Sequence, residues 1–272
     1  MNKIGIRAHD IGKFDEKTLS KKVMEYGFDG VQLVFKKAID HPVDFNNLIE
    51  MKKHFQYPMI MMLGAYFNPI HPDPKVVEEG IENFKNHLKI ANSLKTKFVG
   101  TETGSLMGSP WGYVKENHSN ESLNQMIHVI KDLADTASTY KSYIAIEGAY
   151  AHVAYSPQRI KKILEEVKSP YVKVTIDLFN YLHLGNYQDR MEIFETCLNL
   201  LRDDIVIFHL KDFIVQNEKL VQVGLGQGLM DFPKIIRRIQ EVKPEAYLIF
   251  EGVTGEDIKT SYDYIKSLLE GK

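Results

Sequence analysis

The sequence predicts a single (β/α)8 barrel, and three observations lead to this fold class. Short β-branched runs alternate with longer amphipathic segments along the chain, which is the order of a parallel sheet with crossover helices. Eight such pairs occur in 272 residues, about 34 residues each, and a βαβ unit needs roughly 30 or more. The length is also close to the roughly 250 residues of a complete TIM barrel.

The predicted strands are eight short apolar runs, each followed by a helical segment. Runs of this length and composition, bounded by turn residues, are typical of buried parallel strands. They occupy residues 3–8, 30–35, 59–64, 98–101, 143–146, 172–176, 205–208 and 247–250.

The intervening segments show helix periodicity and helix start or stop signals. The first has a cap-like start at Asp15 and a stop at Gly27, and proline stands in the first turn at Pro74 and Pro157. We expect helices at about 15–26, 44–54, 74–94, 121–140, from 156, and at 187–201, 232–242 and 255–269.

A doubly wound open sheet is the structural alternative. It usually has fewer units and a glycine-rich first turn, and the segment GIRAHDIG after the first run is not a GxGxxG fingerprint. No linker or low-complexity segment interrupts residues 1–272. The simplest prediction is therefore one domain.

Composition points away from several function classes. The formal net charge is -2 and the apolar fraction 44%, which favours neither a nucleic-acid partner nor a membrane surface. The apolar runs are too short to span a bilayer, and the N-terminus has no secretory signal pattern. Cys197 is the only cysteine, so we expect a buried thiol and a reducing, cytoplasmic compartment.

The last four predicted strands all end in a residue that can bind a metal. These residues are Glu147, Asp177, His209 and Glu251, at intervals of 30, 32 and 42 residues, one β/α unit each. Barrel chemistry sits where strands end and βα loops begin, and adjacent strands lie about 4.8 Å apart. We therefore expect the four side chains to converge.

Three converging carboxylates repel one another unless a proton or a cation neutralises them. A divalent cation resolves this most simply. Three carboxylates and one imidazole suit Mn²⁺, Mg²⁺, Co²⁺ or Zn²⁺ and are too oxygen-rich for a usual structural zinc site. The sequence therefore predicts one divalent metal ion, with Mn²⁺ as the first choice.

The second half of the chain resembles the sugar phosphate isomerase/epimerase group of the xylose isomerase-like barrel superfamily. The matching segments are IAIEGAYAHVAYSP, VKVTIDLFNYL, FHLKD, VGLGQGLMDF and LIFEG, within about residues 143–255. The first half matches mainly in layout. The resemblance implies that Glu147, Asp177, His209 and Glu251 are metal ligands.

Two further features follow from the resemblance. Asn180 stands where some relatives have a histidine, and the glycines of VGLGQG (Gly224, Gly226 and Gly228) form a loop that closes over the site. The superfamily also includes apurinic-type endonucleases, which use three metals and several more histidines. Those histidines are missing here, which favours one metal and argues against DNA cleavage.

The chemistry implied is proton transfer next to a carbonyl. The metal stabilises an enediolate, and a carboxylate removes and returns the proton. Family epimerases use the glutamate pair, so Glu147 and Glu251 are the acid/base candidates. The predicted function is an isomerase or epimerase of a small carbohydrate (a ketose, a polyol-derived sugar or a keto-inositol). Alternatives are an inosose dehydratase-like lyase, an endonuclease, a hydrolase and a non-catalytic sugar-binding barrel. Relatives form dimers or tetramers, but no sequence feature here fixes a homo-oligomer.

Other residues near strand ends are candidates for substrate binding. Trp111 and Phe67 are possible apolar walls in βα loops. His54, His87 and His128 fall in predicted helices and are expected on the solvated outer ring. The substrate-binding candidates are His9, Glu102, Trp111, His152, His183, Lys211 and Asp212.

No phosphate site is evident in the sequence. There is no Walker-type loop and no basic cluster beyond Lys211. Arg7 is one candidate anion partner, but strand alternation directs it outward if His9 also points outward. The expected substrate is therefore unphosphorylated.

Overall fold

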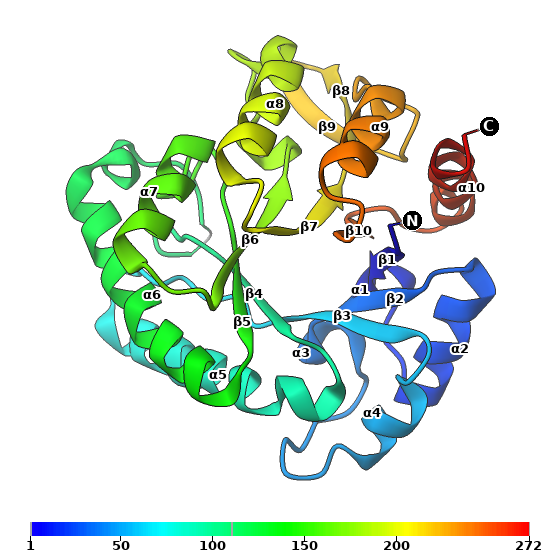
Figure 1. Ribbon diagram of the computed structural model, residues 1–272, viewed down its shortest axis with the longest axis horizontal. Coiled ribbons are helices and arrows are strands. Elements are labelled where there is room, and N and C mark those ends of the chain that lie inside the picture. Colours follow the sequence, from blue (N-terminus) through cyan, green and yellow to red (C-terminus); the bar gives the residue numbers. More distant parts are fainter. Residues whose placement is uncertain (1, 110, 272) are drawn as a thin grey trace.

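The fold is a closed eight-stranded parallel barrel surrounded by helices, as predicted (Figure 1). The structure is a computed structural model, and it describes residues 2–109 and 111–271. The strands follow one another around the barrel in chain order, and β1 pairs with β10 to close it. The barrel strands are β1 (Ile4–Arg7), β2 (Gly30–Leu33), β3 (Met59–Gly64), β4 (Phe98–Glu102), β5 (Tyr143–Glu147), β6 (Val172–Asp177), β7 (Ile205–Leu210) and β10 (Tyr247–Phe250).

Eight helices of six or more residues lie outside the strands in the described part of the chain (Figure 1). Several begin at a side-chain cap: Asp15, Ser119 and Ser156 each accept a hydrogen bond from a backbone N–H of the first turn, which satisfies a group the helix leaves unpaired. The helices are α2 (Glu16–Tyr26), α4 (Ile49–His54), α5 (Pro74–Ala91), α6 (Asn120–Tyr140), α7 (Pro157–Val167), α8 (Arg190–Leu201), α9 (Phe232–Val242) and α10 (Asp257–Leu269).

The helix expected from residue 44 begins instead at Ile49. The Asp44 carboxylate accepts a hydrogen bond from the Asn46 backbone N–H at 2.9 Å, and this local turn competes with helix formation. Shorter 3₁₀ segments complete the helical elements: η1 (Asn92–Leu94), η2 (Lys115–His118), η3 (Phe179–Tyr181) and η4 (Tyr187–Asp189).

Two single-turn helices shorten the first two strands relative to the prediction. They are α1 (Ala8–Ile11) and α3 (Phe35–Ala38). His9 therefore lies within α1 and does not end a strand, which corrects the expectation. Four residues are too few for an amphipathic period to be recognised in the sequence. Both helices lie at the carboxyl ends of their strands, where a barrel carries its functional site.

An antiparallel hairpin, β8 (Asp212–Gln216) and β9 (Lys219–Val223), replaces the loop expected between β7 and α9. Its turn residues Asn217 and Glu218 have φ angles of 49° and 55°, the left-handed pair of a two-residue hairpin turn. Asn-Glu is not the usual sequence of such a turn, so the hairpin could not be predicted from a turn motif.

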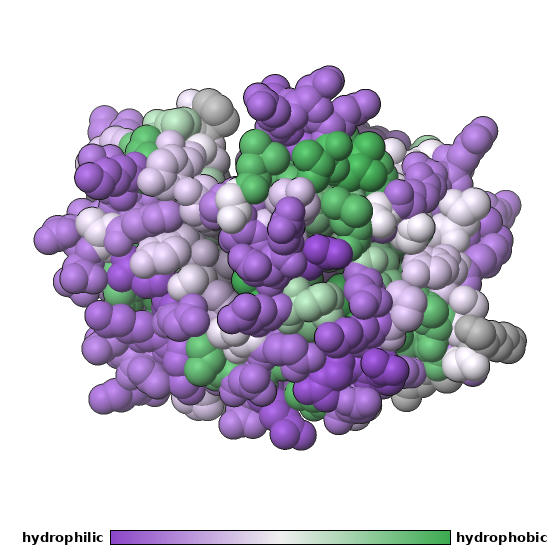
Figure 2. Space-filling view, turned by 90° about the horizontal axis from the view of Figure 1, so that it is seen from above, coloured by the Kyte–Doolittle hydropathy of each residue, from purple (hydrophilic) through white to green (hydrophobic). Residues whose placement is uncertain are grey.

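The buried apolar residues form two clusters. The larger one fills the space between strands and helices and includes Cys197, which is buried as expected. The smaller cluster consists of Met61, Met62, Ala145, Ile207 and Ile249. The face shown in Figure 2 is mostly hydrophilic and carries a hydrophobic patch. No described helix is long and apolar enough to cross a membrane.

Candidate metal centre

The four predicted metal-binding residues converge at the carboxyl end of the barrel. Each offers one ligand atom, and these atoms all lie within 4.8 Å of one another. The cause is strand alternation, because residues two apart share a face. Ala145, Ile207 and Ile249 are buried two residues before three members of the group. The polar group therefore forms a layer above an apolar one. We call Glu147, Asp177, His209 and Glu251 the four-residue cluster.

His209 lies at the middle of this cluster. Its Nδ1 lies 3.0 Å from Glu251 Oε2 and 3.3 Å from Glu147 Oε2, with Asp177 Oδ2 at 3.8 Å. Neither ring nitrogen forms a hydrogen bond of good geometry, although both are buried. Burial acts to lower the pKa of His209, but the surrounding carboxylates, Glu147 foremost, raise it to about 9.

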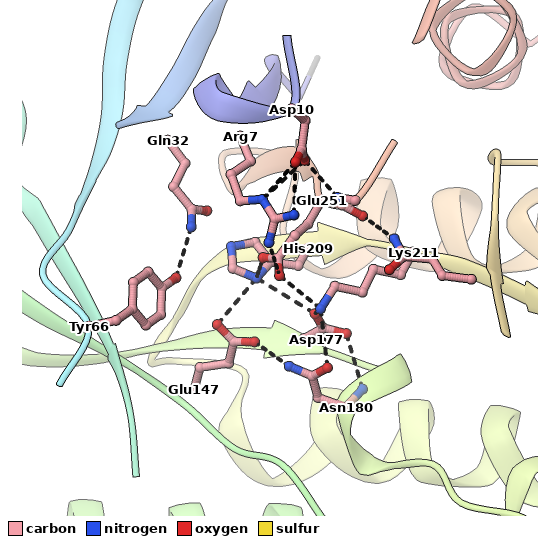
Figure 3. A network of polar contacts seen from close by, with 12 residues as sticks. Arg7, Asp10, Gln32, Tyr66, Glu147, Asp177, Asn180, His209, Lys211 and Glu251 are labelled. Atoms are coloured by element: carbon pink, nitrogen blue, oxygen red, sulfur yellow. Dashed lines mark hydrogen bonds and ion pairs between the residues drawn. The ribbon is translucent and has the colours of Figure 1, made fainter. Parts of the chain in front are cut away.

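Lys211 contacts the cluster from one side (Figure 3). Its Nζ lies 2.7 Å from Asp177 Oδ2 and 2.9 Å from Glu251 Oε1. Burial disfavours the ammonium, yet Asp177 and Glu251 together raise the pKa of Lys211. Burial also raises the pKa of Asp177 to about 6, with Lys211 opposing the rise. Lys211, predicted as a substrate contact, is therefore primarily an ion-pair partner of the cluster.

Arg7 contacts the cluster from the opposite side. Its Nη1 donates to Glu251 Oε1 at 2.8 Å, while Nε and Nη2 donate to the Asp10 carboxylate. Asp10 is in turn held by the Gly252 backbone N–H at 2.7 Å. Burial acts to raise the pKa of Glu251, but the nearby cations, Lys211 first, hold it well below its usual range. The expectation that Arg7 points outward is wrong, because β1 ends at Arg7 and alternation cannot be continued to His9.

Asn180 joins the remaining carboxylates. Its Nδ2 donates to Glu147 Oε1 at 2.6 Å, its Oδ1 accepts from Lys211 Nζ at 3.2 Å, and its backbone N–H donates to Asp177 Oδ1 at 3.2 Å. The asparagine therefore fixes the orientation of two cluster carboxylates.

The charges of this centre fit a divalent cation. The three cluster carboxylates and Asp10, which is paired with Arg7, carry four negative charges, and the Lys211 and Arg7 cations offset two of them. A divalent cation beside a neutral His209 brings the sum to zero. The unpaired ring nitrogens of His209 and the hard oxygen donors are what such an ion requires.

A cavity of about 940 Å³ opens beside the cluster. Glu147 and Glu251 line it, whereas Asp177 and His209 do not. Glu102 also lines it, at the end of β4 and in register with Glu147. Burial, reinforced by Glu147 and Glu251, raises the pKa of Glu102 to about 8. The cavity therefore has a carboxyl-rich floor.

Two other predicted residues, His9 and Trp111, also line the cavity. His152 lies behind Trp111, with the ring centroids 6.0 Å apart, and it is buried without lining the cavity. Burial lowers the pKa of His152 and keeps its ring neutral. His152 therefore supports Trp111.

Three expectations about loop residues need correction. Asp212 is fully buried, and its carboxylate accepts hydrogen bonds from the backbone N–H groups of its own loop, so it holds the loop in place. His183 Nδ1 accepts from the Gly185 N–H, and the ring packs 4.0 Å from Tyr150, away from the cavity lining. Phe67 packs against Phe84 in the core.

His87 also differs from its prediction. It was expected on the solvated surface of a helix, but it is 5% exposed and stacks on Phe35 of α3, with ring centroids 5.6 Å apart. Phe35 and His87 both line the outer part of the cavity. Because α3 was missed in the sequence, its contact with α5 could not be foreseen.

Gln32 and Tyr66 are cavity residues that the sequence analysis did not select. Gln32 Nε2 donates to the Tyr66 hydroxyl at 2.8 Å (Figure 3), and both side chains line the cavity. Gln32 is 1% exposed. A glutamine inside the otherwise apolar run GVQLVF was the available signal, because a buried polar side chain in a strand needs a partner.

The family model described as xylose isomerase-like TIM barrel matches residues 21–268. The chain belongs to the xylose isomerase-like TIM barrel family. No curated protein matches it significantly.

Solved structures of the xylose isomerase-like fold cover nearly the whole chain. A D-tagatose 3-epimerase-like protein has a TM-score of 0.77 at 17% identity, covering 98% of this chain and 97% of that one. The E. coli 3-keto-D-glucoside 4-epimerase YcjR in its apo form has a TM-score of 0.74 at 17% identity, covering 100% of both chains. The IOLI protein with a bound zinc atom has a TM-score of 0.74 at 17% identity, covering 98% and 96%. At these identities the likeness establishes the fold.

Proposed function

We propose that this protein is a divalent-metal-dependent isomerase or epimerase of a small carbohydrate. One observation carries the proposal: of the four-residue cluster, only the two glutamates predicted as acid and base line the cavity. Asp177 and His209 lie behind them, as residues that hold an ion without touching a substrate are expected to lie. The sugar epimerases among the structures of similar fold support the same reaction class.

The proposed roles follow from the contacts. Glu147, Asp177, His209 and Glu251 would hold the metal, with Mn²⁺ as the first candidate. Once bound, the ion supplies Lewis-acid polarisation of a carbonyl and its neighbouring hydroxyl.

Glu147 and Glu251 exchange a proton with the carbon next to the carbonyl, since both reach the cavity from opposite sides of the cluster. Glu102, Trp111 and His9 contact the sugar. The single buried cysteine supports a reducing, cytoplasmic location.

The test pairs metal analysis of the purified protein with turnover of a panel of ketoses and keto-inositols. We expect one divalent ion per chain and, in ordinary water, a product of the same mass as the substrate. In deuterium oxide, one carbon-bound hydrogen should be exchanged for deuterium. A product lighter by one water would replace the isomerase with a lyase. Turnover that persists after complete removal of metal would refute the metal requirement.

Glu251→Gln tests the assignment within the site. The amide keeps the shape of the side chain but cannot accept a proton, so we expect turnover to fall by a factor on the order of 10² or more while the circular dichroism spectrum is unchanged. Glu256→Gln, at an exposed position in the following loop, is the matched control and should retain full activity.

A further inference from the structure

The cavity extends well beyond the metal centre. Its volume of about 940 Å³ lies near the top of the roughly 300–1,000 Å³ typical of small-molecule sites. Besides the carboxyl-rich floor, it is lined by residues of the α1–α2 connection and of α3 and the segment after it. A substrate that fills it has one end at the cluster and another end at this outer rim.

The outer rim carries an excess of positive charge. Lys13, Lys36 and Lys37 line it, together with one carboxylate, Asp40. None of the three lysine side chains forms a hydrogen bond or an ion pair within the described part of the chain, in contrast with the Lys211 side chain, which pairs with Asp177 and Glu251. Their ammonium groups therefore remain available to a ligand.

The charge balance differs between the two ends of the cavity. The floor holds Glu102, Glu147 and Glu251 together with Arg7, which is paired with Glu251, whereas the rim has three lysines against one aspartate. The positive charge of the rim lysines also contributes to the pKa of two neighbouring histidines. The pKa of His9 is lowered to about 4, first by burial and then by Arg7, with Lys37 adding to the fall. Lys36 likewise adds to the lowering of the pKa of His87, which burial dominates.

Apolar side chains line the cavity beside the lysines. Phe35, Ile39, Val43 and Phe45 belong to α3 and the segment after it, which also carry Lys36 and Lys37. Apolar walls exclude water and strengthen ion pairs at their edge, because screening by solvent decreases. An anionic group bound at the rim would thus be held more strongly than on an open surface.

We propose that the substrate carries an anionic group, a phosphate monoester or a carboxylate, at the end distant from its reacting carbonyl, and that Lys13, Lys36 and Lys37 bind this group. The inference rests on the proposed function for the orientation of the sugar. It revises the sequence-based expectation of an unphosphorylated substrate, because the three lysines come from two separate segments that only the fold brings together.

The test compares three ligands on the metal-loaded protein: a ketohexose, its 6-phosphate and a 2-keto sugar acid of the same length. Affinities are measured by calorimetry, and turnover by the deuterium exchange described above. We expect at least one anionic ligand to bind roughly ten-fold more tightly than the neutral sugar, as three partly exposed ion pairs allow. The comparison of phosphate with carboxylate identifies the group.

The matched variants remove equal charge at different places. Lys13→Gln, Lys36→Gln and Lys37→Gln combined should abolish the preference for the anionic ligand and leave binding of the neutral sugar unchanged. Lys17→Gln, Lys75→Gln and Lys97→Gln combined change three exposed lysines outside the cavity and should keep the preference. The preference should also weaken as ionic strength rises.

The outcomes separate this inference from the proposed function. If the neutral sugar is turned over and the anionic ligands have no advantage, or if both triple variants behave alike, the rim is not an anion site while the proposed function stands. If no sugar in the panel binds to or is exchanged by the metal-loaded protein, the proposed function fails and the anion site falls with it.

Discussion

The polar atoms of Glu251 contact several different neighbours. One carboxylate oxygen contacts Arg7 and Lys211, the other faces His209, and the backbone carbonyl accepts a hydrogen bond from Gln222 of the hairpin. A side chain held this way has little rotational freedom. Such partners of metal-binding residues commonly contribute 10- to 100-fold to metal affinity or activity.

At the residue scale, Arg7→Met should therefore reduce kcat by about 10- to 100-fold with a smaller change in KM, because Glu251 loses one of its two cationic partners. Metal affinity, measured by competition with a chelator, should fall in parallel. Arg7→Lys keeps the charge but cannot bind Asp10 and Glu251 at once, so it should restore only part of the loss. Wild-type metal affinity in Arg7→Met would show that Arg7 does not position Glu251.

The four-residue cluster could be predicted from the sequence because each member ends an apolar run whose length fixes its face. Arg7 could not, because its direction depends on where β1 ends, and the end is set by the one-turn helix α1. Gln32 and Tyr66 lay in segments without a recognisable motif. The sequence thus predicted the residues that end the last four apolar runs, and not Arg7 and Gln32 on the first two strands, whose partners depend on the folded arrangement.

At the scale of elements, the segment after β9 depends on a single carboxylate. Asp212 accepts hydrogen bonds from the N–H groups of Phe213, Gly226, Gly228 and Met230 at 2.8–3.0 Å. Asp212→Ala leaves these donors without a partner in a buried site. We expect the free energy of unfolding to fall by on the order of 3 kcal/mol, measured by urea denaturation.

Hydrogen exchange over residues 224–230 should accelerate in the same variant. Asp212→Asn, which keeps one acceptor oxygen, should show a smaller effect. A loss in Asp212→Ala no larger than that of an exposed substitution, about 0.5 kcal/mol, would contradict the role assigned to this carboxylate.

The contact between α5 and α3 gives a prediction about pH. Burial lowers the pKa of His87, so the folded protein keeps the ring neutral while the unfolded chain protonates it near pH 6.5. The unfolded state then binds more protons, and stability contributed by the neutral ring is present above pH 6.5 and decreases as the pH falls below it. The contribution of His87 to the free energy of unfolding should therefore decrease between pH 7 and pH 5.

His87→Phe removes the titrating group and keeps the stacking, so part of that decrease should disappear. His128→Gln, at an exposed position of α6, should retain the wild-type dependence. Parallel curves for wild type and His87→Phe would show that His87 does not contribute to the acid sensitivity.

At the scale of the whole molecule, metal binding should stabilise the fold. The cluster brings together residues from four strands, an arrangement absent from the unfolded chain. An ion present at 100 times its Kd adds about 2.7 kcal/mol, so its removal by a chelator should lower Tm by roughly 5–10 °C. His209→Gln should lose this metal-dependent shift, and an equal shift in the variant would place the ion elsewhere.

Closure of the barrel has a consequence for the order of assembly. The four-residue cluster comes from the second half of the chain, whereas Arg7 and Asp10 belong to β1 and α1. Their contacts with Glu251 and Gly252 form only when β1 pairs with β10 and closes the barrel. Half a barrel therefore holds every proposed ligand, but Glu251 still lacks its contact with Arg7. Tight binding of the ion during refolding should follow the pairing of β1 with β10. The time course of metal binding would therefore report when the barrel closes.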